Sequence, residues 1–429
     1  MNPIVVREYA YLTTSLVQNT LDHAQVPESA FDWLCGLEER RTKGGRLLSV
    51  VGRNELQLRS FVGVLESPCG QVIEILPKHH DLDDPEPARA LMCRLIAGAL
   101  NLPPHEADEA GLRLFRTPLS EWIMGRFLTA LEHLLKRGLR FDYLRVEEES
   151  RYLRGQLDIA RQLRQPPHKG HLLHIRHDVF LANRPENRLL KKALDAVARR
   201  TRDAQNWRLS HELSGVLREL PASQDTEQDF RKWHDDRLMV HYRPVKPWCE
   251  LILRQQLPHS VHGDWRGISF LFPMERLFED YVARWIHRHL QNGARLVTQA
   301  RRHSLCRHRG REMFQLRPDL LLEQGDRRWA MDTKWKRLDA TAPAQKYGIA
   351  QGDFYQMFAY GHHYQGGQGD MALIYPKGRD FSEPLPPFEM QRGLRLWVLP
   401  FDLEAKMLLL PQSWTDEPLP LKITSARAL

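Results

Sequence analysis

The sequence predicts a mixed α+β and α/β protein of several domains, and three observations lead to that class. Short runs typical of strands, separated by turn residues, fill residues 1–85 and predict a β-rich N-terminal domain. Residues 86–260 carry mainly apolar stripes at helical spacing. Residues 261–429 alternate between strand-type and helix-type segments, which predicts an α/β/α domain. A chain of 429 residues is long enough for these three domains.

Composition and charge narrow the classes of function. The chain has 62 Lys and Arg against 54 Asp and Glu, and the net charge of +8 favours a polyanionic partner. Its five cysteines are scattered without a Cys-x-x-Cys pair, so neither disulfides nor a zinc site are expected. No signal peptide, no apolar run of the roughly 18 residues that span a membrane, and no P-loop motif is present. We therefore expect a cytoplasmic protein that has no membrane contact.

The N-terminal domain is predicted from its strand and turn signals. Residues 47–51 and 56–64 favour strands, and 72–76 is expected to pair back as a hairpin after the turn at 67–70. A basic loop with glycines, residues 40–46, precedes these strands. It could contact nucleic acid or a partner protein, and an ordinary solvated loop is the alternative.

The middle region is predicted to be mixed and largely helical. Residues 81–87 are rich in Asp and Pro and favour a linker, after which a helix is expected over about 88–100. Thr117 and Pro118 supply a capping hydroxyl and a first-turn proline, so a second helix begins there, and Gly138 ends it. Its apolar residues recur at helical spacing, which indicates core packing.

Further along the middle region, strands and loops are expected over 142–181, followed by a helix opened by Pro185 and another over about 210–220. Four histidines recur every third residue. Prolines and a glycine in the same stretch would break a helix, and on a strand this odd spacing would place successive histidines on opposite faces. We therefore expect no metal site here. The four histidines are His168, His171, His174 and His177. Residues 244–247 and 259–267 are predicted to lead into the last domain.

The last domain is expected to begin near Ile268 and to open with a helix whose apolar face covers residues 274–286. Strand-type segments follow, and a helix near residue 356 separates the third from the fourth. The predicted strands are 295–298, 314–322, 329–334, 371–375 and 394–399.

Two acids and a lysine lie around a predicted hairpin in this domain. If the loop consists of residues 324–325, Asp319 lies opposite Ala330, and Asp332 is its diagonal neighbour, roughly 7–8 Å away. Lys334 is two residues beyond Asp332. Because side chains two apart on a strand share a face, all three side chains are predicted to converge.

Convergent carboxylates repel each other unless a cation lies between them. Mg²⁺, with Mn²⁺ as the alternative ion, needs only one or two carboxylates with water and substrate phosphate, so Asp319 and Asp332 are the predicted metal ligands. Lys334 would orient or help deprotonate an attacking water, or neutralise charge on a phosphate. An ordinary cluster of surface ion pairs is the alternative.

A helix over residues 353–360 places Gln356 and Tyr360 one turn apart on one face. This helix together with the Asp-x-Lys strand resembles the PD-(D/E)xK nuclease superfamily, and specifically its RecB-type branch, which adds a Gln-x-x-x-Tyr helix. The resemblance implies that Gln356 and Tyr360 support the site or the DNA. It also implies a third metal ligand on the first helix of the domain, here Glu279. A solvated helix acid is the alternative for Glu279, and a half-buried aromatic beside a solvated amide is the alternative for the pair.

A cluster of basic residues precedes the hairpin with the acids. Such charge density beside a site for phosphodiester cleavage predicts contacts with DNA phosphates that position the duplex without reading its sequence. A solvated hairpin tip is the alternative. The predicted DNA-binding residues are Arg301, Arg302, Arg307, Arg309 and Arg311.

The order of motifs along the chain resembles the McrC family, over about residues 72–376 and most clearly from 138 onward. The motifs in chain order are 73–78 (IEILPK), 154–159 (RGQLDI), 187–191 (NRLLK), 271–278, Asp319, Asp332-x-Lys334, Gln356-x-x-x-Tyr360 and 374–376 (IYP).

This resemblance implies the endonuclease subunit of a McrBC-type restriction system in antiviral defence, which cuts double-stranded DNA containing 5-methylcytosine. The implied partner is a McrB-like hexameric AAA+ GTPase that recognises the modified base and whose hydrolysis this subunit stimulates. The missing P-loop agrees with that division of labour. Residues 86–260 are the expected region of partner binding. Two alternatives remain: a stand-alone RecB-like exonuclease or repair nuclease, and a non-catalytic activator of an AAA+ ring.

Overall fold

The computed structural model describes residues 3–39, 45–78, 84–100, 118–234, 236–254, 269–291, 293–411, 414 and 419–422. The chain divides into two compact units. The first unit combines Met1–Leu119 with Leu257–Leu429, and the second is Ser120–Gln256. Sheets and helices in these units confirm the predicted mixed α/β class. Among the described residues, no helix combines the length and the apolar character needed to cross a membrane.

The N-terminal part of the first unit contains a sheet with the strand order β1-β7-β6-β11. The expected hairpin is present, because β6 (Phe61–Glu66) pairs antiparallel with β7 (Val72–Leu76) across a turn closed by the Ser67 amide and the Gln71 carbonyl. β1 (Ile4–Arg7) adds to β7 in parallel. A second sheet, packed in the same apolar core, has the order β3-β2-β5-β4. Its strands and the helix beside them are β2 (Tyr11–Thr13), β3 (His23–Gln25), α1 (Glu28–Glu39), β4 (Leu48–Gly52) and β5 (Glu55–Leu58).

The fourth strand of the first sheet comes from much further along the chain. β11 (Phe270–Pro273) pairs antiparallel with β6, and Leu271 lies opposite Gly63. A Cβ on Gly63 would lie 1.8 Å from the carbonyl oxygen of Phe270, and its φ of +134° also favours glycine. Residues that the sequence places at the start of the last domain therefore complete an N-terminal sheet.

The C-terminal part of the first unit is built on a sheet with the order β12-β15-β16-β17-β19-β18. β16 pairs antiparallel with β15 and parallel with β17, so the sheet is mixed. Its strands are β12 (Ala294–Thr298), β15 (Leu320–Gln324), β16 (Arg327–Thr333), β17 (Gly369–Pro376), β18 (Leu385–Glu389), β19 (Leu394–Asp402) and the short β20 (Met407–Leu408), which pairs with β19.

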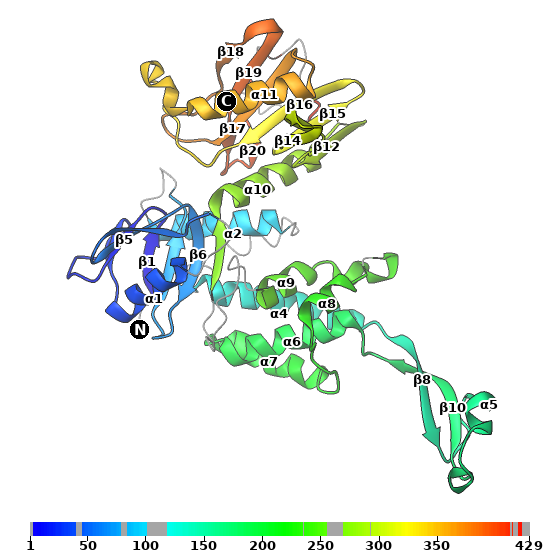
Figure 1. Ribbon diagram of the computed structural model, residues 1–429. Coiled ribbons are helices and arrows are strands. Elements are labelled where there is room, and N and C mark those ends of the chain that lie inside the picture. Colours follow the sequence, from blue (N-terminus) through cyan, green and yellow to red (C-terminus); the bar gives the residue numbers. More distant parts are fainter. Residues whose placement is uncertain are drawn as a thin grey trace. The chain divides into compact units, whose positions relative to one another are not determined.

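Two helices cover opposite faces of this sheet. On α11 (Gln351–Tyr364), Met357 and Tyr360 pack in one core cluster with Val398 of β19. α10 (Met274–Arg288) contacts Phe401 of β19 instead. Because these two β19 residues are an odd number apart, their side chains point to opposite faces, and the sheet lies between the helices (Figure 1). One helix thus packs on each face of this sheet.

One further helix and a separate hairpin belong to the first unit. α2 (Pro85–Ala99) packs against α10, where the ring of Tyr281 leaves no room for a side chain at Gly98. β13 (His303–His308) and β14 (Arg311–Leu316) form a two-stranded hairpin of their own, apart from the large sheet.

The second unit is a group of helices from which a long arm projects (Figure 1). The helices are α4 (Leu119–Arg137), α6 (Pro185–Arg200), α7 (Ala204–Val216), α8 (Thr226–Arg231) and α9 (Lys246–Arg254). The arm consists of β8 (Asp142–Ser150) and β10 (Leu173–Leu181), paired antiparallel over their whole length, with β9 (Gln156–Leu157) and α5 (Ile159–Leu163) at its far end.

Several predicted boundaries are wrong. α2 begins at Pro85, inside the expected linker, because Asp84 caps it by accepting the Glu86 amide. The helix expected over 210–220 is α7, which begins at Ala204 because Asp203 caps it. The single strand expected over 314–322 is two strands, broken at 317–319, and part of the expected passage at 244–247 lies in α9. The expected features at 40–44, 81–83, 117 and 259–267 lie outside the described residues.

Candidate active site

The β15–β16 hairpin places the two predicted aspartates at the same end of its two strands. Gln324 pairs with Arg327, so the two-residue turn starts at Gly325, whose φ of +59° favours glycine. Leu320 lies opposite Met331, and extending this register by one residue places Asp319 opposite Asp332. The expectation that Asp319 faces Ala330 is wrong, because the turn is one residue further along the chain. The two side chains still share a face.

Asp319 is held from two sides. Its Oδ2 accepts the backbone N–H of Thr333 at 2.9 Å and the Thr333 hydroxyl at 3.1 Å. Its Oδ1 accepts the side-chain amide of Gln299 at 3.0 Å, and the same amide nitrogen donates to Glu279 Oε1 at 2.8 Å. Gln299 therefore connects the acid on α10 with the acid at the start of β15. The backbone φ of Gln299 is +50°, which is uncommon for a residue other than glycine.

The other predicted residues form a chain of contacts on the α11 face of the sheet. The Lys334 ammonium pairs with Asp332 Oδ2 and lies 3.4 Å from Gln356 Oε1. The Gln356 amide donates to the Tyr360 hydroxyl at 2.7 Å, and that hydroxyl donates to the carbonyl of Arg317 at 2.7 Å. The Gln-x-x-x-Tyr helix thus links the lysine to the segment that precedes Asp319.

Two acids of the site have raised pKa values. Burial and then the charge of Asp319 raise the pKa of Asp332 to about 7, and the same two causes raise the pKa of Glu279 to about 7. Burial lowers the pKa of Lys334, but the charges of Asp332 and Asp319 and the hydrogen bond to Asp332 outweigh it, so the pKa is raised. Lys334 is therefore an ammonium at neutral pH, and a further cation here would relieve repulsion.

The donor set fits Mg²⁺. Asp319 and Asp332 offer hard carboxylate oxygens, and Asp332 Oδ2 is buried without a hydrogen-bond partner of normal geometry. No group of three His, Cys, Asp or Glu side chains that could hold a metal is found in the described part of the chain. Two carboxylates are enough for Mg²⁺ when water and phosphate complete its shell. Glu279 contacts Gln299, and its role as a third ligand stays a prediction.

The predicted DNA-binding arginines lie on and beside the β13–β14 hairpin. Arg302 pairs with Glu323 of β15, and Arg307 pairs with Glu312 across the hairpin at 3.3 Å. Arg309 sits in the turn with a φ of +49°. The structure ties two of these arginines to acids other than Asp319 and Asp332, and DNA contact by this hairpin stays a prediction.

Sequence reasoning did not single out Gln299 or Thr333. Thr333 is the middle residue of Asp-x-Lys, and its backbone N–H and hydroxyl both contact Asp319. Gln299 directly follows β12, whose Thr298 pairs with Leu320 next to Asp319. Only the pairing of β12 with β15 makes Gln299 a neighbour of Asp319, so no motif in the chain could have identified it.

Comparison with known proteins gives one family and one fold. The family model of the McrBC 5-methylcytosine restriction system component matches residues 56–376. A chain from an assembly of Thermococcus gammatolerans McrB AAA+ hexamers with bound McrC superposes with a TM-score of 0.66 at 18% identity, covering 94% of this chain and 95% of that one. A chain from the T. gammatolerans McrBC complex gives 0.51 at 22% identity, covering 67% and 88%. No curated protein sequence matches significantly.

Proposed function

Because the chain belongs to the McrBC family of 5-methylcytosine restriction system components, we propose that it is the nuclease subunit of such a system and cuts double-stranded DNA with Mg²⁺. The observation that carries this proposal is the convergence of Asp319, Asp332 and Lys334 on one face of the β15–β16 hairpin. The link from Lys334 through Gln356 to Tyr360 supports it, since that helix completes the resemblance to PD-(D/E)xK nucleases.

Each side chain has a role in hydrolysis. The carboxylates of Asp319 and Asp332 would hold Mg²⁺, which when bound supplies Lewis-acid activation and charge neutralisation at a phosphodiester. Lys334 is charged, so it orients the attacking water or stabilises negative charge on phosphate through its Nζ hydrogens, and it does not take up a proton. Gln356 and Tyr360 hold Lys334 in place relative to Asp319.

The proposed partner is a McrB-like hexameric AAA+ GTPase. The Thermococcus chain with this fold comes from an assembly of McrB AAA+ hexamers with bound McrC. The sequence has no P-loop of its own, which agrees with nucleotide hydrolysis by the partner. The resemblance to the family assigns recognition of the methylated base to the partner as well. The subunit described here contributes the cut and stimulates the hydrolysis.

The arm of the second unit is the proposed site of partner contact. Large apolar side chains at its far end are exposed to solvent. They include Tyr152 (80% exposed) and Leu163 (82% exposed), and Leu153 and Ile159 lie between these two in the sequence. Exposed apolar groups on a projecting element are typical of protein contacts. The helices of the second unit hold the base of the arm, since Arg184 next to α6 pairs with Asp142 of β8.

Replacing Lys334 tests the nuclease assignment. We expect Lys334→Ala to lower the cleavage rate of the reconstituted complex by at least about 100-fold, because one preorganised charge at a reacting group is worth this much. Stimulation of the partner's GTPase should stay unchanged. The measurement is the rate of cutting of methylcytosine-containing plasmid with Mg²⁺ and GTP, alongside GTP turnover. Lys336→Ala, two residues further on, is the matched control and should cut within twofold of the unmodified protein.

Other outcomes decide between the alternatives. Unchanged cleavage by the Lys334→Ala complex would remove the catalytic assignment and leave a non-catalytic activator of the ring. Digestion of DNA by the isolated chain with Mg²⁺, without the AAA+ partner or nucleotide, would instead indicate a stand-alone nuclease.

A further inference from the structure

A buried carboxyl group outside the proposed catalytic residues connects the N-terminal sheet with the active site. Glu8, which directly follows β1, is fully buried. Its Oε1 accepts the indole N–H of Trp335 at 2.7 Å and the backbone N–H of Lys78 at 2.9 Å, and its Oε2 accepts the Ser60 hydroxyl at 3.3 Å. Residues 8 and 335 are brought into direct contact although more than three hundred residues separate them.

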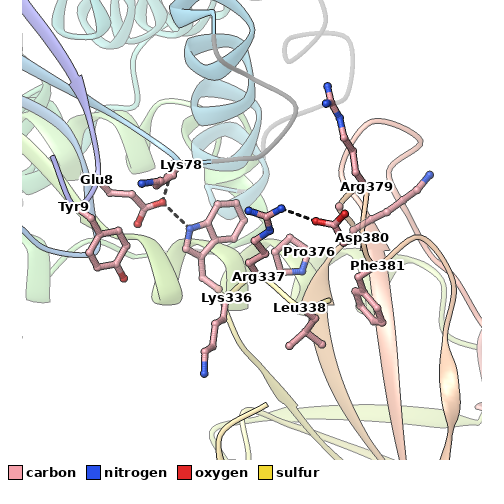
Figure 2. A pocket seen from close by; sticks show the side chains of 13 residues that line it. Glu8, Tyr9, Lys78, Lys336, Arg337, Leu338, Pro376, Arg379, Asp380 and Phe381 are labelled. Carbon is pink, nitrogen blue, oxygen red and sulfur yellow. Dashed lines mark hydrogen bonds and ion pairs between the residues drawn. The ribbon is translucent and has the colours of Figure 1, made fainter. Parts of the chain in front are cut away.

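The surroundings of Glu8 give its carboxyl few other partners. Glu8 and Trp335 line a pocket of about 330 Å³ (Figure 2). Lys336 and Arg379 of the same pocket point away from Glu8 in that view. Among the described residues Glu8 forms no ion pair, so the three hydrogen bonds hold the carboxyl in place. Because the carboxyl group of Glu8 is buried and accepts three hydrogen bonds, it also holds the three groups that donate to it in place.

Trp335 connects the carboxyl group of Glu8 with the residues of the site. It directly follows Lys334, and its ring packs on Phe278 of α10 with the centroids 5.4 Å apart. Phe278 directly precedes Glu279. The indole therefore lies between the strand end that carries the lysine and the helix that carries the acid.

The N-terminal sheet also fixes the start of α10. The carbonyl of Ser60, which lies just before β6, accepts the backbone N–H of Met274 at 3.0 Å. Met274 is the first residue of α10 and directly follows β11, a strand of that same sheet. Ser60 thus contacts α10 through its carbonyl and Glu8 through its hydroxyl, so both attachments meet at one place.

We propose that Glu8 is a positioning residue for DNA cleavage, which acts through Trp335 to hold Lys334 and the Glu279 helix at their working separation. The proposal rests on the proposed nuclease function. It gives the N-terminal sheet a task in catalysis, although no residue of that sheet belongs to the site. Loss of the indole–carboxyl hydrogen bond leaves the metal ligands present but lets Lys334 move, and small displacements of a catalytic group cost rate rather than substrate binding.

Ionisation of Glu8 does not break this link. Burial raises the pKa of Glu8 to about 7, so both protonation states are populated near neutral pH. A neutral carboxyl group still offers a carbonyl oxygen to the indole and to Lys78 N–H. Glu8→Gln, which keeps one carbonyl oxygen in the same shape, is therefore the conservative variant that should retain the function.

The experiment compares Glu8→Leu, Glu8→Gln and Trp335→Phe in the reconstituted complex with its AAA+ partner, Mg²⁺, GTP and methylcytosine-containing plasmid. Glu8→Leu and Trp335→Phe should each lower kcat about tenfold with KM within twofold, whereas Glu8→Gln should keep at least half of the activity. The double variant of Glu8→Leu and Trp335→Phe should be no slower than the slower single variant, because both remove one hydrogen bond. If Glu8→Leu does not fold, Trp335→Phe carries the test, since it retains the ring that packs on Phe278.

Trp414→Phe is the matched control. It removes an indole hydrogen bond of 3.1 Å to the buried Asp370 and keeps a ring that can stack on Trp397, in a cluster without any proposed catalytic residue. This variant should lose a similar amount of thermal stability and cut at the unmodified rate. Equal cleavage by Trp335→Phe and Trp414→Phe, or a tenfold loss in Glu8→Gln, would overturn the positioning role. Failure of the nuclease proposal itself would be seen separately, as unchanged cutting by Lys334→Ala.

Discussion

At the scale of single residues, two carboxylates that repel each other lie where a cation is expected to bind. Asp332 is almost wholly buried, lies opposite Asp319 and forms an ion pair with the ammonium of Lys334. A buried carboxylate beside another carboxylate is costly to ionise. The same arrangement gives a divalent cation a large gain on binding, so the protein without metal should be less stable than its packing allows.

Asp332→Asn tests this stored repulsion. The pKa of Asp332 is raised from its ordinary 3.8 to about 7 by burial and by Asp319. The folded chain therefore binds more protons than the unfolded chain between about pH 4 and 7, and the free energy of unfolding falls as pH rises through that window. Asn cannot ionise. In a chelating buffer we expect the variant to be more stable than the unmodified protein by at least about 1 kcal/mol at pH 8, and by less at pH 5.

Thermal unfolding at both pH values measures this difference. Asp326→Asn, in the exposed turn of the same hairpin, is the control and should show no such pH-dependent gain. A destabilised Asp332→Asn protein at pH 8 would mean that the ion pair with Lys334 outweighs the repulsion.

Gln299 gives a second prediction at this scale. Its amide donates to both Glu279 and Asp319, so it holds the two acids toward each other. Partners of this kind typically affect metal affinity by 10- to 100-fold. We expect Gln299→Leu to weaken Mg²⁺ binding, measured by calorimetry, by about tenfold. Gln365→Leu removes a glutamine that bonds the backbone of Ala330 and Asp370 outside the site, and its Mg²⁺ affinity should be unchanged.

The sequence predicts residues with a motif and misses residues that depend on tertiary register. Asp319, Asp332 and Lys334 could be placed on one face because strand alternation is local, and Gln356 with Tyr360 because helical spacing is local. Gln299 and Glu8 reach the site through strand pairing and domain contact. Nothing in their immediate sequence indicates a partner 20 or more than 300 residues away.

At the scale of elements, the turn and cap residues account for the errors. Asp84 and Asp203 are helix caps, and each starts a helix a few residues before the expected position. The expected strand over 314–322 misses the break at 317–319, since apolar residues typical of strands lie on both sides of it, with Phe314 and Leu316 before the break and the leucines of 320–322 after it. That break separates the β13–β14 hairpin from the sheet, and most residues of the hairpin, its arginines included, are exposed.

The β13–β14 hairpin provides a prediction about DNA affinity. If Arg307, Arg309 and Arg311 contact phosphates, replacing all three by Gln should weaken binding of methylated and unmethylated duplexes equally. The slope of log affinity against log salt should fall by about 2 to 3, because each phosphate contact contributes roughly 0.9. Fluorescence anisotropy of the complex at several salt concentrations measures it. Arg208→Gln on α7 is the control. An unchanged slope in the triple variant would mean that these arginines are solvated and do not contact DNA phosphates.

At the scale of the whole molecule, one compact unit is built from two separate segments of the chain. The second unit is an insertion, since residues before Leu119 and after Leu257 belong to one body. β11 completes the N-terminal sheet and continues directly into α10, which covers the sheet of the active site. Three consecutive domains are the natural expectation from composition, because local patterns do not reveal that a late strand pairs with an early one.

The inserted unit makes the final prediction possible. Ser150 pairs with Leu173 in the β8–β10 ladder, so residues 151–172 can be replaced by a two-residue Asn-Gly turn that closes the same hairpin. This removes the exposed Tyr152, Leu153, Ile159 and Leu163 together with β9 and α5, and it leaves the other helices of the second unit and the proposed active site in place. We expect the shortened protein to keep its melting temperature and to lose binding to the AAA+ partner in sedimentation. Its stimulation of GTP hydrolysis should fall by more than about tenfold, which is the loss of about 1.4 kcal/mol of coupling.

Replacing the exposed Trp207 on α7 by Ala is the control for loss of surface apolar area in the same unit, and this variant should stimulate GTP hydrolysis normally. Full stimulation by the shortened protein would move partner contact away from the arm. Because the proposed active site lies in the other unit, lost stimulation with an unchanged fold would separate the element that stimulates the partner from the element proposed to cut DNA.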